Sequence, residues 1–390
     1  MRDTKVALKI CKEYEETVVA GKLKEGFDLL EGISKFIKPS HKVLIKPDLY
    51  NATLPNQAKT TNPNIVSALA ELIAQIGAKC IIADSPKGSF KQSKLDNVYD
   101  KTKMLQASNN GNAQLSVNEH ISIITNPAGE CSRDIYILDA VNDADVIINV
   151  GKLRCDKHLG LIGCSQNLFG LVPGKVKQLI KSRCYTLNAY YNYLIDLYEA
   201  LDNKIVINVL DGIVGNESND DPRILNAILI GENCYAVDSV ALRVINQNPN
   251  NSLLLNEAQR RGKFDFSTTI EGDNIETLIC SDFNYTKFLN NVKSGSAKKF
   301  KREYNSYQRR PIISSKLCKG CKVCANNCPM NAINMKNNSV GEYAVVDYNK
   351  CVTCMKCVQN CPYKIIKTRT PIKYRPIDKM LNKSLKTKQK

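Results

Sequence analysis

Cys318-Lys-Gly-Cys321-Lys-Val-Cys324-Ala-Asn-Asn-Cys328-Pro329 recurs later in the chain as Cys351-Val-Thr-Cys354-Met-Lys-Cys357-Val-Gln-Asn-Cys361-Pro362. The two copies are 33 positions apart, and every cysteine and proline of one copy has a counterpart in the other. Each copy reads C-x2-C-x2-C-x3-C-P, the spacing with which bacterial-type proteins hold [4Fe–4S] clusters. The duplication therefore predicts a compact C-terminal module with two related cluster sites.

The spacing also predicts which cysteines share a cluster. Two-residue gaps let three thiolates of one loop converge on one cube, while the fourth cysteine, before the proline, ligates the cluster of the other copy. Structural zinc, the main alternative, uses pairs of cysteines and needs neither the third cysteine nor the proline. The predicted ligand sets are Cys318, Cys321, Cys324 and Cys361 for the first cluster, and Cys351, Cys354, Cys357 and Cys328 for the second.

This segment resembles the two-cluster bacterial ferredoxins. Ala332-Ile333 and Ile365-Ile366, placed alike after each Cys-Pro, fit the pseudo-symmetric fold of those proteins. The resemblance implies a small α+β domain, two [4Fe–4S] clusters and one-electron transfer at low potential. Small free ferredoxins of this kind are usually acidic, whereas this module is basic.

Charge is distributed very unevenly along the 390 residues. The formal net charge is +17, made up of about −2 for residues 1–291 and about +19 for residues 292–390. Such a basic region favours docking of an acidic redox partner, although a solvated tail that aids solubility has the same composition. Nucleic acid is a less favoured partner, because no base-reading motif accompanies the lysines. Positive charge near a cluster should also raise its reduction potential.

These composition changes predict the domain boundaries. We expect an α/β domain at 1–291, a basic linker at 292–310, a two-cluster ferredoxin domain at 311–370 and a basic tail at 371–390. No apolar run approaches the roughly 20 residues of a membrane span. The chain opens without the apolar core of a signal peptide. Sixteen cysteines without a secretory context indicate metal binding in the reducing cytoplasm rather than disulfides.

The first 290 residues alternate β-branched runs with amphipathic stretches. This alternation is typical of an α/β domain with a mostly parallel sheet. Predicted strands are Val6–Ile10, Lys42–Lys46, Cys80–Asp84, Ile121–Thr125, Val146–Val150, Ile205–Leu210 and Ala227–Ile230. Predicted helices are Leu23–Ile37, Asn64–Ile76, Val176–Ala200 and Ala236–Ile245.

Charged side chains follow several of these strands. Parallel α/β sheets bind ligands beyond the carboxyl ends of their strands, so the charges could line one crevice for a small anion. Strand ends are also polar simply because loops are polar, and the aspartates could pair with the cations internally. The candidate ligand-binding residues are Lys46, Asp84, Lys152, Arg154 and Asp211, with Asp48 as a further carboxylate.

A glycine-punctuated, partly apolar segment, 158–175, could form either a buried turn or a wall of the crevice. It is not a phosphate-binding Walker loop, because Gly170 and Gly174 are too close and Val176 replaces Ser or Thr. His158 is a candidate general acid or base, but a structural or surface histidine is the more ordinary interpretation.

The body resembles the domain-of-unknown-function 362 family over about residues 40–245. Motifs that carry the resemblance are Val43-Leu-Ile-Lys-Pro47, Thr60-Thr61-Asn62-Pro63, Ala83-Asp84-Ser85-Pro86, Asp145-Val-Ile-Ile-Asn149, Asn167-Leu-Phe-Gly-Leu-Val-Pro-Gly174, Asp211-Gly-Ile-Val-Gly215 and Ala236-Val-Asp238. The resemblance implies an α/β fold and a ferredoxin module often joined to it. The family usually has Asn at Asp48, Thr-His at Cys155-Asp156 and Lys at Gln166, and a glycine-rich loop at 216–222. The differences indicate a diverged branch.

Two functions remain open from the sequence. One is an oxidoreductase component in which the ferredoxin module exchanges electrons with an α/β ligand-binding domain. The other is a non-catalytic electron carrier or binding subunit whose α/β domain docks a partner protein. The missing family Thr-His favours the second, and the strand-end charges favour the first.

Overall fold

The protein is described by a computed structural model. The structure describes residues 3–86, 92–109, 111–117, 119–174, 176–177, 180, 184, 187–285, 310–328, 331–339, 341–348, 350–351 and 355–369. It divides into two compact units, one made of residues 1–121, 136–175 and 201–290, the other of residues 122–135, 176–200 and 291–390. The predicted linker, apart from Arg310, and the predicted basic tail lie outside the described residues.

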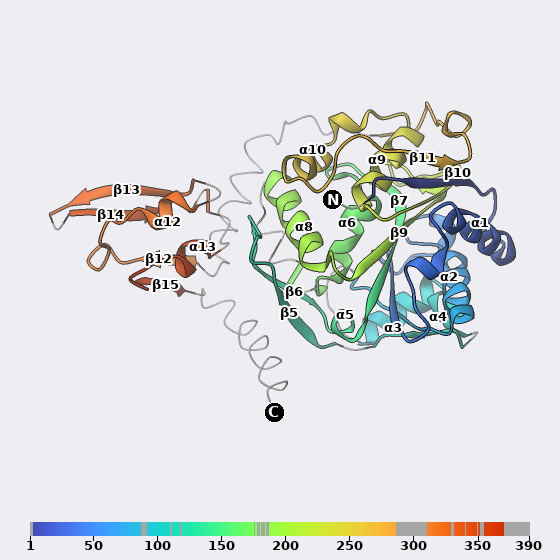
Figure 1. Ribbon diagram of the computed structural model, residues 1–390, viewed down its shortest axis with the longest axis horizontal. Helices are drawn as coiled ribbons and strands as arrows, with labels where there is room; N and C mark the ends of the chain where they lie inside the picture. Colours follow the sequence, from blue (N-terminus) through green and yellow to red (C-terminus); the bar gives the residue numbers. More distant parts are fainter. Residues whose placement is uncertain are drawn as a thin grey trace. The chain divides into compact units, whose positions relative to one another are not determined.

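The first unit is built on a nine-stranded sheet (Figure 1). Across the sheet the strands are β11 (Ile270–Gly272), β1 (Val6–Ile10), β10 (Pro222–Gly231), β9 (Ile205–Asn216), β7 (Val146–Asp156), β2 (Lys42–Pro47), β3 (Lys79–Ile82) and β4 (Ala113–Leu115), with β8 (Gly160–Leu161) paired to β7. Pairs β9–β7–β2–β3–β4 and β1–β11 are parallel, whereas β10 is antiparallel to β1 and β9. The predicted α/β fold with a mostly parallel sheet is confirmed.

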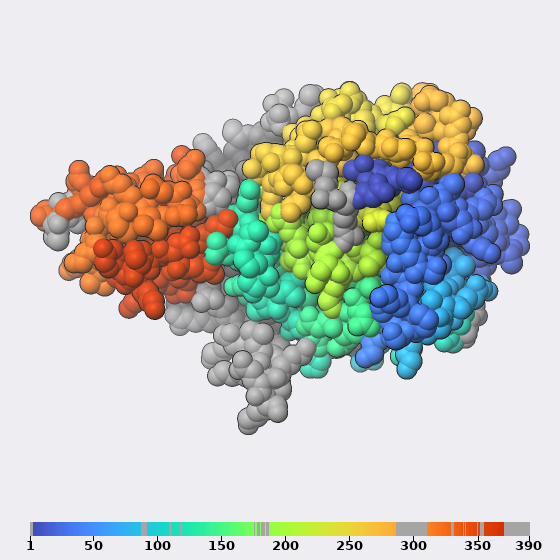
Figure 2. Space-filling model, viewed as in Figure 1, coloured from blue at the N-terminus to red at the C-terminus, as the bar shows by residue number. Residues whose placement is uncertain are grey.

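Residues far apart in the sequence lie side by side at one end of this sheet. Strand β1, near the amino terminus, pairs in parallel with β11, at residues 270–272. Figure 2 shows the corresponding dark blue and orange-yellow surfaces next to each other. The amino-terminal strand is therefore fixed by the last segment of the first unit.

Helices cover the sheet in two groups. The first consists of α1 (Glu16–Asp28), α2 (Pro63–Ile76), α3 (Gln92–Lys101) and α4 (Met104–Asn109); the second includes α6 (Gly163–Asn167), α9 (Cys234–Val244) and α10 (Leu253–Arg260); α5 is Ala140–Asp143. Helix α2 packs on β2, β3 and α1, and α9 packs on β9, β10 and α6. In β2 every residue from Val43 to Pro47 is buried, as expected for a strand covered on both faces.

Local chemistry explains where the helices begin and end. Asn62 accepts a hydrogen bond from the Asn64 amide and caps α2, Pro63 occupies its first turn, and Gly77 ends it at φ +88°. The prediction of a helix from Leu23 to Ile37 was wrong at both ends. Glu31 and Gly32 adopt φ of +75° and +87°, which an α-helix cannot accommodate.

Two further elements differ from their predictions. The predicted helix Val176–Ala200 is broken, because Cys184 is not helical and α8 runs from Leu187 to Leu201. Strand β5 (Ile121–Thr125) has the predicted bounds but pairs with β6 (Asp134–Leu138) in a separate two-stranded sheet. No helix in the described ranges is long and apolar enough to cross a membrane.

Among its described residues, the cysteine module contains two short helices and two small sheets. Strand β12 (Arg310–Ile313) pairs with β15 (Ile366–Arg369), and β13 (Ile333–Asn338) pairs with β14 (Gly341–Val346). Helices α12 (Val323–Asn326) and α13 (Lys356–Gln359) occupy equivalent places in the two repeats. Each is preceded by a residue in the left-handed region, Lys322 at φ +60° and Met355 at φ +61°. The duplicated sequence thus forms duplicated local structure, and the predicted small α+β module is confirmed.

Candidate functional site

The structure brings the predicted strand-end charges together at one edge of the large sheet. Strand β2, which carries Lys46, pairs directly with β7, which carries Lys152 and Arg154, and β7 pairs with β9, which carries Asp211. Strands β7 and β9 continue past their predicted ends, with a register shift between Lys152 and Arg154. Lys152, Arg154 and Asp211 therefore lie within strands, not in loops after them.

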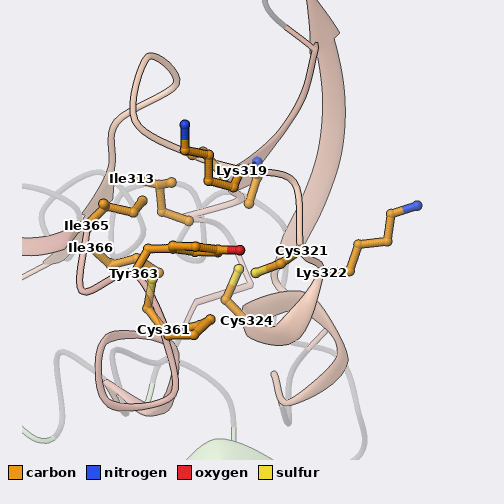
Figure 3. Close-up of a pocket in the computed structure, with 12 residues that line it drawn as sticks. Ile313, Lys319, Cys321, Lys322, Cys324, Cys361, Tyr363, Ile365 and Ile366 are labelled. Atoms are coloured by element: carbon orange, nitrogen blue, oxygen red, sulfur yellow. Dashed lines mark hydrogen bonds between the residues drawn. The ribbon is translucent and has the colours of Figure 1, made fainter.

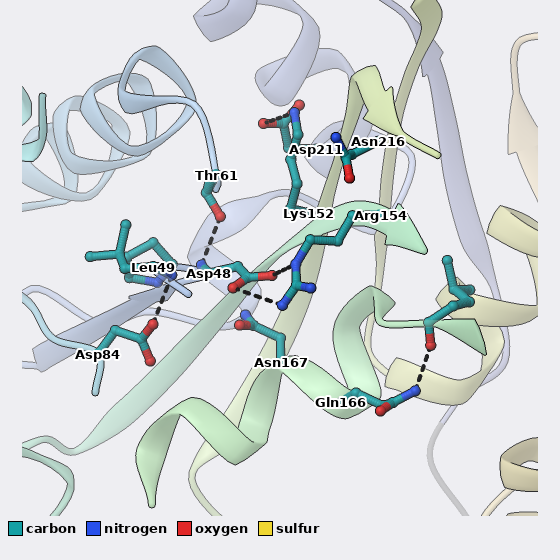
Figure 4. A network of polar contacts seen from close by, with 12 residues as sticks. Asp48, Leu49, Thr61, Asp84, Lys152, Arg154, Gln166, Asn167, Asp211 and Asn216 are labelled. Atoms are coloured by element: carbon teal, nitrogen blue, oxygen red, sulfur yellow. Dashed lines mark hydrogen bonds and ion pairs between the residues drawn. The ribbon is translucent and has the colours of Figure 1, made fainter. Parts of the chain in front are cut away.

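Lys46 and Asp84 form the first of three ion pairs in this region. Lys46 Nζ lies 2.9 Å from Asp84 Oδ1, and both side chains are buried. Lys46 also donates to Asn167 Oδ1 and to the Pro47 carbonyl, each at 2.7 Å. Asp84 Oδ2 accepts from the Leu49 amide at 2.7 Å (Figure 4). The buried charge of Lys46 is thus surrounded by three oxygen atoms of the chain itself, as a buried ammonium requires.

Lys152 and Asp211 form the second pair, again fully buried. Lys152 Nζ lies 2.9 Å from Asp211 Oδ2 and donates to Tyr14 Oη at 2.9 Å. Tyr14 Oη in turn donates to Asp211 Oδ1 at 2.7 Å, and the Asn62 amide donates to Asp211 Oδ2 at 2.9 Å. Burial lowers the pKa of Lys152, with Asp211 opposing the shift. Burial and the Asp211 carboxylate raise the pKa of Tyr14. No sequence motif points to Tyr14, which reaches this site from the segment before α1.

Arg154 and Asp48 form the third pair. Arg154 Nε donates to Asp48 Oδ2 at 2.7 Å (Figure 4). The guanidinium also lies 4.8 Å from the centre of the Tyr50 ring. The Asp48 amide donates to Thr61 Oγ1, whose hydroxyl donates to the Val150 carbonyl. The Arg154 side chain is 14% exposed, compared with 0% for Lys46 and 1% for Lys152. Arg154 is therefore the most accessible of the three candidate cations.

A chain of buried amides runs beneath these pairs. Asn167 Nδ2 donates to Asn149 Oδ1 at 2.9 Å, and Asn149 Nδ2 donates to Asn208 Oδ1 at 2.8 Å. Gly170 lies so close to the first pair that a Cβ there would be 2.0 Å from Asp84 Oδ1 and 2.3 Å from Lys46 Nζ. The Asn-Leu-Phe-Gly segment therefore packs directly against the first ion pair.

Asp238 is a further buried carboxylate at the amino terminus of α6. Its oxygens accept from the amides of Cys164, at 2.6 Å, and Ser165, at 3.0 Å, and from the Ser165 hydroxyl. Burial raises the pKa of Asp238 to about 7.

His158 lies outside this cluster on an exposed turn, where its amide donates to Asp156 Oδ1 at 2.7 Å. Burial raises the pKa of the Cys155 thiol, which keeps that cysteine unreactive.

The second candidate site is a cavity in the cysteine module. Four cysteines, three from the first repeat and one from the second, line a common cavity (Figure 3). The remaining lining consists of apolar residues, two lysines and the aromatic ring and hydroxyl of Tyr363. The cavity is lined by Ile313, Cys318, Lys319, Cys321, Lys322, Cys324, Ala344, Cys361, Pro362, Tyr363, Ile365 and Ile366.

The residues at this cavity fit a [4Fe–4S] cluster. The donor set is four thiolates, and no His or carboxylate is among the lining residues. Burial, with the neighbouring Cys318 and Cys321, raises the pKa of Cys324, because grouped thiolates repel one another until a metal neutralises them. The Ala344 amide donates to Cys318 Sγ at 3.5 Å. Such amide–sulfur bonds stabilise the negative charge of a bound cluster.

The ligands predicted for the second cluster are described in part. Cys351 and Cys328 are half-buried and Cys357 is buried in the module core, whereas Cys354 lies outside the described residues. The Ala332 amide donates to Cys328 Sγ at 3.2 Å. Both sites thus receive an amide–sulfur bond. The cysteines of each site would hold a [4Fe–4S] cluster, which accepts and releases single electrons when bound.

Comparison with known proteins agrees with both parts of the chain. Residues 43–243 match the family described as Domain of unknown function (DUF362), and residues 317–365 match the 4Fe-4S dicluster domain. A curated relative, Thylakoid-associated protein sll1697 of Synechocystis sp., is 28% identical over 256 residues, which cover 63% of this chain and 75% of the relative.

A solved structure is similar over part of its length. It is the lactate racemase apoprotein from Thermoanaerobacterium thermosaccharolyticum, with a TM-score of 0.40 and 16% identity. The similarity covers 60% of this chain and 56% of that chain, so this protein spans just over half the length of the solved one.

The family match covers more than half of the chain, and the duplicated cysteine loops match the dicluster domain. The protein therefore belongs to the DUF362 family, and its C-terminal part is an iron–sulfur electron-transfer module.

Proposed function

We propose that this protein is a component of an oxidoreductase, in which a module with two [4Fe–4S] clusters exchanges single electrons with an α/β ligand-binding domain. One observation carries the proposal: Cys361 of the second repeat lines the same cavity as Cys318, Cys321 and Cys324 of the first. Shared ligation of this kind holds two clusters close together, which suits transfer of electrons from one to the other.

The α/β domain would contribute a site for a small anionic substrate. Lys46, Lys152 and Arg154 lie on two adjacent strands, at the edge where parallel sheets bind their ligands. Arg154 is the most exposed of the three, so an anion would meet it first and would compete with Asp48 for its planar guanidinium. An open pocket of about 310 Å³, lined in part by Gln57 and Lys59, adjoins this edge through Asn216, whose side chain donates to the Gln57 carbonyl.

A second candidate is a non-catalytic electron carrier or binding subunit whose α/β domain docks a partner protein. A specific observation favours it: each cation that was predicted to bind an anion already contacts an aspartate of this chain at 2.9 Å or less. Breaking a buried pair of this kind is strongly unfavourable unless the ligand restores every contact.

The partner in either case would be an acidic redox protein, and the compartment the reducing cytoplasm. The excess of positive charge in residues 292–390 supports the first inference, and the use of sixteen cysteines supports the second. The proposed domain boundaries remain 1–291, 292–310, 311–370 and 371–390.

The cluster proposal is tested by metal analysis of protein purified without oxygen. We expect about eight iron and eight acid-labile sulfide per chain, with an electron paramagnetic resonance signal of interacting [4Fe–4S]⁺ clusters after reduction. One or two zinc ions without sulfide would exclude it.

A further inference from the structure

The two cysteine loops carry different side chains at equivalent positions. The residues that follow the first two cysteines are Lys319 and Lys322 in the first loop, and Val352 and Met355 in the second. Lys322 and Met355 both adopt φ near +60°, so at this position the two loops differ in side-chain chemistry and not in φ. The first loop therefore carries two lysines where the second carries apolar residues.

These two lysines lie at the rim of the first cluster cavity. Both line it, both are exposed, and Cys321 between them is the exposed cysteine of its ligand set. Figure 3 shows the side chains of Lys319 and Lys322 extending away from the sulfur of Cys321, outward from the cavity. Lys322 also lies 3.1 Å from Glu342, but both side chains are largely exposed, so this pair is weak and readily exchanged for another carboxylate.

The asymmetry is one of placement more than of total charge. The second loop has its own lysines, Lys350 and Lys356, at positions where the first loop has Leu317 and Val323. Each of these lysines stands directly before a cysteine, whereas Lys319 and Lys322 each stand directly after one. If binding depended only on the overall positive charge, all four lysines would contribute equally to it. If binding depended on specific contacts, only Lys319 and Lys322 would contribute strongly. This difference provides the control for a test.

We propose that the cluster site of Cys318, Cys321, Cys324 and Cys361 is the port at which an acidic one-electron carrier docks, with Lys319 and Lys322 as the contact residues. The inference rests on the proposed electron-transfer function. One electron passes between the reduced carrier, a ferredoxin or flavodoxin, and the oxidised cluster; no bond is made or broken and no proton is needed. Complementary charge at the rim would orient the carrier at the exposed Cys321 edge.

The test measures binding separately from electron transfer. The probe is an acidic plant-type ferredoxin whose iron is replaced by gallium, so that it docks without exchanging electrons, and the partner is the full-length protein with its clusters. For Lys319→Glu/Lys322→Glu we expect about tenfold weaker binding at low salt, or about 1.4 kcal/mol, because two exposed charge contacts are lost. For the wild type, affinity should fall steeply as salt rises, since the Debye length shortens from about 10 Å at 0.1 M to about 3 Å at 1 M.

The control is Lys350→Glu/Lys356→Glu, which changes the net charge by the same amount. We expect its affinity to stay within about twofold of the wild type. Equal weakening of the two variants would overturn the proposal in favour of a general field, and weakening of the control alone would place the port at the other cluster.

A second variant controls for the possibility that the glutamate substitutions weaken binding by destabilising the first cluster. Lys319→Val/Lys322→Met gives the first loop the residues of the second and should also weaken binding, while iron content stays at the wild-type value. Unchanged affinity in this variant would overturn the proposal, as would displacement of the ferredoxin by anionic phospholipid vesicles or DNA at equal charge concentration. Absence of iron and sulfide from the wild type would contradict the proposed electron-transfer function. The binding measurements with the variants test only the docking proposal, so the two failures are distinguishable.

Discussion

Gly170 occupies a position where no side chain fits. A Cβ there would lie 2.0 Å from Asp84 Oδ1 and 2.3 Å from Lys46 Nζ, two atoms that form a buried ion pair. The carbonyl of Gly170 also accepts from the Ser85 amide at 3.0 Å, which fixes the backbone in place. The buried pair therefore requires glycine at this position.

Replacing Gly170 with alanine should therefore destabilise the first unit. We expect the free energy of unfolding to fall by about 3 kcal/mol, from overpacking and from separation of the buried pair. Urea denaturation followed by circular dichroism measures this change. Gly21→Ala in α1 is the matched control: a Cβ there meets nothing within 4 Å, so stability should stay constant or rise by about 0.5–1 kcal/mol. Equal effects of the two substitutions would contradict the argument.

Cys361 is the residue that distinguishes crossed from uncrossed ligation. It belongs to the second repeat but lines the cavity of the first. Cys361→Ser should therefore perturb the cluster bound by Cys318, Cys321 and Cys324, and should leave the other comparatively intact. Iron analysis with electron paramagnetic resonance of the reduced protein would separate the two clusters. Loss confined to the cluster of Cys351, Cys354 and Cys357 would show the ligation to be uncrossed.

At the scale of elements, α6 depends on a carboxylate supplied by another helix. This helix of five residues has no capping side chain of its own, and Asp238 of α9 accepts the Cys164 and Ser165 amides at its amino terminus. Gly163, at φ +50°, leaves room for the carboxylate, since a Cβ there would be 2.2 Å from Asp238 Oδ1. The packing of α6 on α9 therefore depends on the protonation state of the Asp238 carboxyl group.

That acid should make stability depend on pH. Its pKa in the folded protein is raised to about 7 from an ordinary value of 3.8, so between these values the native state holds a proton that the unfolded chain has lost. The native state is therefore favoured at low pH, and this contribution falls by up to about 1.4 kcal/mol per pH unit as pH rises towards 7, then levels off.

Urea denaturation of the wild type and Asp238→Asn at several pH values isolates this contribution. The difference in the free energy of unfolding, wild type minus variant, should decrease from pH 5 to pH 7 and stay constant from pH 8 upwards. A difference that does not change with pH would mean that Asp238 is ionised throughout.

For the whole molecule, the open question is whether the α/β domain passes electrons to a ligand. Lys152 is the residue to change, because its ammonium group is buried and contacts both Asp211 and Tyr14. Removing one partner of a buried pair typically costs about 3–5 kcal/mol. Lys152→Met keeps the apolar length of the side chain and limits this loss.

Oxygen-free bleaching of cluster absorbance by a panel of small anionic metabolites compares the two functions. If the domain binds an anion, the wild type should show ligand-dependent bleaching, and Lys152→Met should lose it with clusters and fold intact. Lys35→Met, a change at a partly exposed ion pair with Glu31, is the matched control and should keep it. If no anion changes the clusters of the wild type, the non-catalytic carrier is favoured.

The sequence by itself determined the features that depend on local pattern. The spacing of eight cysteines identifies the iron–sulfur module, alternating apolar runs identify the α/β class, and strands Val6–Ile10 and Ile121–Thr125 have the predicted bounds. These properties follow from the reach of a short loop and from the period of a strand, which neighbouring residues fix.

The pairing of the buried charges depends on the tertiary structure. Asp48, Asp84 and Asp211 are far from their partners along the chain, and only strand register brings each to within 2.9 Å of a cation. Tyr14 enters the site from a segment with no motif, and Asp238 reaches α6 across a helix interface. A buried charge is stable only with a partner, but which partner it finds depends on the packing of the whole sheet.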